Sequence, residues 1–153
     1  MGLGSEVRAI FNNQIESSGV AQVVYPDAAA GVAAVSDGAA AAWAWAAWVE
    51  VVAAAVIPNP SWLVGLFLCR PVVEAFYGDF QVGIGAAGAE VGQAIFPFDE
   101  ELFAVVEGKS VTQYLPYPIK IMGSPRVAIR LRKSTAASAA GCTAKVIFNT
   151  GLG

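Results

Sequence analysis

The stretch Arg126-Val127-Ala128-Ile129-Arg130-Leu131-Arg132 decides the fold, because its apolar and charged residues alternate with a period of two. Val127, Ile129 and Leu131 fall on one side of such a chain, and the three arginines fall on the other. This pattern is typical of a strand with one buried and one solvated face. Just before it, residues 118–121 and the turn residues 122–125 (Met-Gly-Ser-Pro) predict a second, antiparallel strand.

Similar patterns extend outward from this hairpin in both directions. Residues 142–149 alternate again, and apolar runs between proline and glycine turns predict further strands at 62–69, 76–84, 90–96, 102–106 and 111–114. No helical pattern long enough for a crossover between parallel strands separates these runs. We therefore expect a mainly β fold, an antiparallel β-sandwich of seven to nine strands, with a jelly roll as one candidate topology.

The alanine-rich segment 28–57 allows three interpretations. Residues 38–57 have the length of a transmembrane helix, but Glu50 lies inside and the tryptophans lie in the middle of the span. The spacing of Trp45, Trp48 and Val52 would also suit a buried amphipathic helix. We favour a strand over 43–52, apolar on both faces, because the residues that follow are β-forming.

The N-terminal residues predict a short helix or an arm. Leu3, Val7, Ile10, Phe11 and Ile15 share one helical face, and Ser17-Ser18-Gly19 would end the helix. We place the arm at 1–25 and one sandwich domain at 26–153. The arm can pack on its own subunit or dock on a neighbouring one.

Composition narrows the functional classes. The chain has 153 residues, of which 56% are hydrophobic and only 14% charged. Such a composition leaves too few charges to cover a monomer's surface, and we expect the extra apolar surface to be buried in an oligomer or larger assembly. A net charge of −3 without a basic tract argues against nucleic acid as a partner. The chain has no histidine, so the commonest general base and zinc ligand are missing, and we expect no enzyme activity, metal or cofactor.

Two further features are interpreted as structural. Gly83-Ile84-Gly85-Ala86-Ala87-Gly88 matches the glycine pattern of dinucleotide-binding loops, but Pro97 leaves little room for the helix such a loop needs. A glycine-rich hairpin is the better prediction. Cys69 and Cys142 lie in apolar runs far apart in the sequence and are expected to be buried free thiols, although pairing stays open.

Three segments resemble small structural proteins of tailed bacteriophages. They are Trp43-x-Trp45-x-x-Trp48-Val49-Glu50, residues 85–91, and the pair of strands 117–121 and 126–130. The turn at 122–125 departs from that pattern, with Pro125 where threonine or serine is usual. The resemblance implies a β-sandwich of the virion, either a head decoration (cement) protein or a neck or tail attachment protein.

From this we expect a homo-oligomer, as a trimer, that binds a major capsid protein or another virion protein. The expected interface residues are Phe11, Ile15, Trp43, Trp45, Trp48, Arg126, Arg130 and Arg132. The alternative is a neck, tail or receptor-binding module that stacks carbohydrate on Trp43, Trp45 or Trp62. A membrane protein ranks third.

Overall fold

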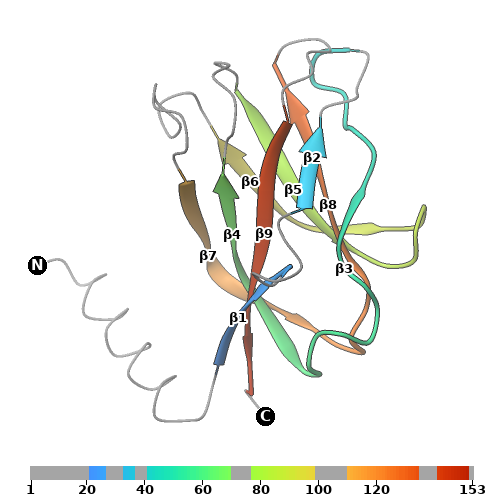
Figure 1. Cartoon of the computed structure of the whole chain (residues 1–153), viewed down its shortest axis with the longest axis vertical. Helices are drawn as coiled ribbons and strands as arrows, with labels where there is room; N and C mark the ends of the chain where they lie inside the picture. Colours follow the sequence, from blue (N-terminus) through green and yellow to red (C-terminus); the bar gives the residue numbers. More distant parts are fainter. Residues whose placement is uncertain are drawn as a thin grey trace, which may run out of the picture.

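The chain folds into two antiparallel β-sheets packed face to face (Figure 1). The computed structural model describes residues 21–26, 33–36, 41–69, 77–98, 110–134 and 141–151. The first sheet has the order β1 (Ala21–Tyr25), β9 (Gly141–Thr150), β4 (Ser61–Cys69), β7 (Ser110–Ile121), and β2 (Ala33–Ser36) also pairs with β9. The second sheet has the order β3 (Val49–Val52), β8 (Val127–Lys133), β5 (Gly78–Ile84), β6 (Val91–Phe98). The prediction of a mainly β sandwich is confirmed.

The strand pairs are nested in the way that defines a jelly roll. The outermost pair is β1 with β9, and inside it follow β3 with β8, β4 with β7 and β5 with β6. The pairs β4–β9 and β5–β8 join these hairpin layers into sheets. The chain therefore rolls up as one long folded hairpin, which is the jelly-roll topology that the sequence offered as a candidate.

The core lies between the sheets and follows the predicted alternation. Val127, Ile129 and Leu131 of β8 are fully buried, whereas Arg130 and Arg132 between them are only partly buried. The other sheet contributes apolar side chains from β4 and β9 to the same cluster, among them Leu63, Leu66, Leu68, Ala144, Val146 and Phe148. Burial of these two inner faces is the main stabilising contribution to the sandwich.

The segment before β3 differs from the predicted strand 43–52. Regular strand pairing begins only at Val49, and residues 41–48 run beside β8 with two backbone hydrogen bonds. The amide of Trp43 donates to the carbonyl of Lys133 at 2.7 Å, and the amide of Ala46 donates to that of Leu131 at 2.8 Å. The helical interpretations of residues 41–57 are wrong, since this segment is not helical. The described segments contain no helix with the length and hydropathy needed to cross a membrane.

The strand β7 is longer than predicted. Residues 111–114 and 118–121, expected as separate strands, belong to one strand of 12 residues at the edge of the first sheet. The hairpin expected between 118–121 and 126–132 is wrong, because β7 and β8 belong to different sheets and the turn between them crosses from one sheet to the other. Its pairing with β4 is interrupted between Ile119 and Tyr114, where Pro116 and Pro118 have no amide hydrogen to donate. An edge strand tolerates such residues because one of its sides carries no partner strand.

Several predictions fall outside the described part of the chain. These concern the arm over residues 1–20, the strand at 102–106, and the side chains of Cys69 and Cys142. Residues 21–25, which the sequence analysis grouped with the arm, form β1 and pair with β9.

The glycine-rich segment is a hairpin, as predicted. Residues 85–90 connect β5 to β6, and the amide of Ala89 donates to the carbonyl of Ala86 at 3.0 Å. Gly85 has a φ of 135° and Gly88 a φ of 81°. Both values lie in the region that favours glycine. The dinucleotide-loop interpretation is wrong, because the segment leads into the strand β6 and not into a helix.

Candidate interaction surface

Tryptophan and arginine side chains meet on the outer face of the second sheet. The alternation of β8 turns Arg130 and Arg132 outward, and segment 41–48 runs alongside. In the regular strand predicted for 43–52, Trp43 and Trp45 would lie on one face and Trp48 on the other. The structure brings all three to one face because this segment is irregular. We call these five side chains the tryptophan–arginine ladder.

The ladder alternates ring and guanidinium. The guanidinium carbon of Arg132 lies 5.8 Å from the ring centroid of Trp43 and 4.5 Å from that of Trp45. The guanidinium carbon of Arg130 lies 4.7 Å from the Trp45 ring and 4.3 Å from the Trp48 ring. Each contact is a cation–π interaction, worth about 0.5–1 kcal/mol where exposed and more where water is excluded. Burial lowers the pKa of Arg130, with a further lowering from Arg132 and an opposing effect of Glu90.

Small residues in the sheet make room for the ladder. A Cβ atom on Gly83 would lie 2.5 Å from the Trp48 ring, so that ring rests directly on the β5 backbone. Ala128, opposite Gly83 in the neighbouring strand, is fully buried although it belongs to the outer face. The first glycine of the glycine-rich motif is therefore needed for packing of an indole ring.

Cross-strand partners hold the arginines in place. Arg130 lies opposite Gln81 in the β5–β8 register, and its Nε and a terminal nitrogen donate to Gln81 Oε1 at 2.8 and 2.6 Å. Arg132 lies opposite Asp79 and contacts its Oδ2 at 2.7 Å through Nε and at 2.6 Å through a terminal nitrogen. These pairs fix the planes of both guanidinium groups against the rings.

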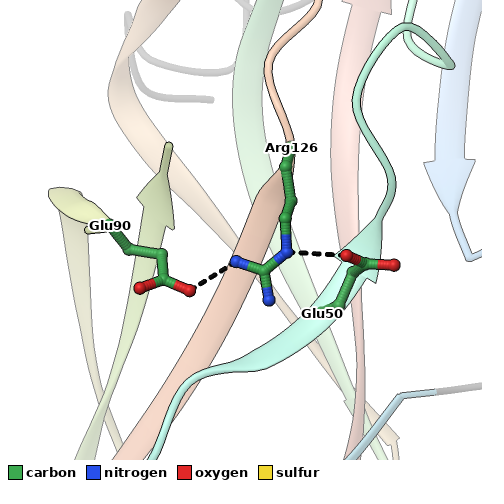
Figure 2. Close-up of polar contacts among 3 residues, drawn as sticks. All are labelled: Glu50, Glu90 and Arg126. Carbon is green, nitrogen blue, oxygen red and sulfur yellow. Dashed lines mark hydrogen bonds and ion pairs between the residues drawn. The ribbon is translucent and has the colours of Figure 1, made fainter. Parts of the chain in front are cut away.

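The third arginine joins three elements at the end of this face (Figure 2). Arg126 Nε donates to Glu50 Oε2 of β3 at 2.6 Å, and a terminal nitrogen donates to Glu90 Oε1 beside β6. The Glu90 side chain is only 2% exposed, whereas that of Glu50 is 50% exposed. Sequence analysis missed Glu90, whose only signal was its place at the end of the glycine-rich hairpin.

The electrostatics of this cluster favour its charged form. Burial of the Glu90 carboxyl disfavours its ionisation, but backbone hydrogen bonds and the hydrogen bond and charge of Arg126 outweigh that effect, so its pKa lies below its ordinary 4.5. Burial likewise opposes the charge of Arg126, but hydrogen bonds with Glu50 and Glu90 raise its pKa. The second carboxylate oxygen of Glu90 is buried without a hydrogen-bond partner among the described groups.

The structure thus unites six of the predicted interface residues on one face, while Phe11 and Ile15 lie outside the described part. The arginines have their partners within the chain. Trp43 is 50% exposed, but Trp45 and Trp48 are partly buried. The Trp45 ring contacts two guanidinium groups of the chain itself, which compete with a sugar for stacking on it. Trp62, on the other sheet, is partly buried with the Lys120 ammonium 5.6 Å from its ring centroid.

An apolar groove lies on the side of the sandwich formed by β6 and β7. We call it the edge groove; it measures about 310 Å³ and is lined by Ile95, Phe96, Pro97, Gln113, Tyr114, Leu115 and Pro116. Gln113 Nε2 donates to the carbonyl of Pro97 at 2.8 Å and ties the two strands together. Ile95 is 49% exposed and Tyr114 53%. Neither 91–98 nor 110–119 contains a charged residue, so the part of this surface that the structure describes is both apolar and uncharged.

Comparison with known proteins gives one structural similarity. No protein-family model matches the chain, and no curated protein matches it. A chain in the solved structure of infectious bursal disease virus, Gx strain, aligns with 88% of this chain at a TM-score of 0.39 and 12% sequence identity. This chain spans 32% of the length of that one. A similarity at this level does not identify a function, which has to come from the chain's own surfaces.

Proposed function

We propose that this chain is a non-enzymatic structural protein of a virion, a decoration (cement) protein that binds the assembled head of a tailed phage as a homotrimer. Its partners would be further copies of itself and a major capsid protein. The edge groove carries the proposal, because its described residues form an uncharged apolar surface, with Ile95 and Tyr114 exposed, which is typical of a protein-binding site. The resemblance of three sequence segments to phage structural proteins indicates which kind of assembly the chain would bind, namely a phage virion.

The mechanism would be stabilisation by binding. A protein that binds the assembled shell and not its separate subunits shifts the equilibrium towards the shell by mass action. A jelly roll suits this role, because its two sheets form a rigid body that loses little conformational entropy on binding. The ladder and the Arg126 cluster add to this rigidity, since they pin the segment before β3 and the β5–β6 hairpin to β8.

The tryptophan–arginine ladder favours the structural role over a carbohydrate-binding role. A carbohydrate-binding module needs aromatic rings with an open face, and here the two inner rings are occupied by the chain's own groups. A neck or tail position would use the same edge groove and stays the second candidate. A nucleic-acid partner is not expected at a net charge of −3.

Co-sedimentation with phage heads tests the proposal. Heads of a phage that encodes this chain, prepared without it, are mixed with the purified protein and pelleted. We expect the chain to pellet at saturation in multiples of three per site and to raise the temperature at which the heads release DNA. A matched variant, Ile95→Glu, should bind at least tenfold more weakly, whereas Val56→Glu, which changes an equally exposed apolar residue away from the groove, should bind normally. Binding to isolated necks or tails and not to heads would exclude the decoration role.

A further inference from the structure

We propose that the edge groove is the docking site for the N-terminal segment, residues 1–20, of a second copy of this chain. The inference rests on the proposed homo-oligomer and assigns the edge groove to the contact between copies. The groove then acts in head binding through assembly of the trimer, which binds heads at several points at once. The predicted N-terminal arm thereby has a binding site, and the groove has a ligand.

The groove and the segment match in chemistry. The described lining of the groove consists of aliphatic, aromatic and proline side chains with a single amide, Gln113, and no charge. On a helix the segment has one apolar face, formed by Leu3, Val7, Ile10, Phe11 and Ile15. Glu6 and Arg8 border this face, and Glu16 lies opposite it. Docking an apolar helix face or strand into an apolar groove removes both surfaces from water. Two copies with a net charge of −3 each meet with the least repulsion at an uncharged surface.

The strand order favours an occupant from another copy over the chain's own segment. β1, which follows the segment in the chain, and β7, which lines the groove, are the two edges of the first sheet, separated by β9 and β4. Three strand spacings put them roughly 14 Å apart. Within one copy the segment would have to turn back across the whole sheet. A neighbour that sets its β6–β7 side against the β1 edge brings its groove to the point where β1 begins.

The lengths permit this contact. Tyr114 of β7 shares a row across the sheet with Val24 of β1, through Gly65 and Ile147, so the groove lies three residues along the strand from Ala21. That offset is about 10 Å, and 20 residues span about 30 Å as a helix and more when extended. A contact between opposite edges is heterologous, so it repeats from copy to copy and forms a ring where the rotation between copies closes. The proposed trimer is one such ring.

Complementation between two variants of the full-length chain tests the inference. Phe11→Glu damages the segment and leaves the groove intact, and Ile95→Glu does the reverse. Each substitution buries an unpaired carboxylate at the contact, and we expect each to weaken self-association at least about 100-fold. By light scattering each variant alone should be a monomer. Their equimolar mixture should form a one-to-one dimer, because one intact segment and one intact groove remain for a single contact.

The control is Val56→Glu, which adds the same charge at an exposed apolar residue outside the groove and should keep the wild-type mass. Circular dichroism and thermal unfolding check that all variants fold. A monomeric wild type, an unchanged mass for Phe11→Glu, or a mixture that stays monomeric would each overturn the inference. Head binding is measured separately. If the wild-type chain is a monomer and still binds heads, the decoration role stands and the proposed contact between copies is excluded. Complementation without head binding would remove the decoration role alone.

Discussion

At the scale of the residue, Gly83 is the position where a single methyl group matters most to the outer face. An added Cβ would lie 2.5 Å from the Trp48 ring, closer than real Cβ contacts, and that ring also contacts the guanidinium of Arg130. We expect Gly83→Ala to lower the free energy of unfolding by about 1–3 kcal/mol. Urea denaturation followed by tryptophan fluorescence measures this. In a Trp48→Leu background most of the cost should disappear, and an unchanged cost in that background would place the strain elsewhere.

Glu90 predicts how stability depends on pH. Its pKa in the folded chain lies below the ordinary 4.5. The ionised carboxylate therefore stabilises the fold above about pH 4.5, and this contribution is lost as the pH falls through the lowered value. The stability difference between wild type and Glu90→Gln should be constant near neutral pH and vanish in acid, which unfolding curves between about pH 7 and pH 3 measure. Glu50→Gln removes the half-exposed partner and should cost less; equal acid sensitivity of wild type and Glu90→Gln would contradict the assignment.

At the scale of the element, the ladder decides whether segment 41–48 stays on β8. Two backbone hydrogen bonds, from Trp43 and Ala46, tie the segment to that strand, and Trp45 contacts both guanidinium groups. Trp45→Ala removes two cation–π contacts, about 1–2 kcal/mol in total. We expect the amides of Trp43 and Ala46 to exchange roughly 5–30-fold faster by local opening, measured by NMR hydrogen exchange. The control is Trp62→Ala, on the other sheet. It should leave the exchange rates of these two amides, compared with those of core amides, as they are in the wild type.

The elements also mark what could be read from sequence. β8 was predicted residue by residue, because apolar side chains mark its inner face and arginines its outer face. Segment 43–52 was predicted as one strand, and its irregular start was missed because Trp43 has a φ of 61°. That is a left-handed conformation which tryptophan rarely adopts and which no sequence pattern announces. The arginines and tryptophans were both singled out as surface groups, but their mutual stacking depends on cross-strand register. The edge groove was missed because its residues come from two separate sheets.

At the scale of the whole molecule, the nested topology contains two kinds of strand pair. Some pairs join segments that are neighbours in the sequence, and others join segments that are far apart in it. Val82 of β5 pairs with Ala94 of the adjacent strand, whereas Val146 of β9 pairs with Tyr25 of β1. Both valines are fully buried. The jelly roll therefore offers a matched pair of core positions that differ mainly in the length of chain that must be closed before their contacts form.

This difference predicts the order of folding. Val82→Ala and Val146→Ala each delete the same two methyl groups from the core and should each cost about 1–3 kcal/mol. We expect Val82→Ala to slow folding, because the β5–β6 hairpin closes the shortest loop and forms early. Val146→Ala should mainly speed unfolding, because β1 and β9 can pair only after the inner layers have formed. Stopped-flow refolding and unfolding in urea give a φ-value for each site. A φ-value at Val146 equal to or above that at Val82 would contradict this order, because β9 would then already be packed against β4 or β1 in the transition state.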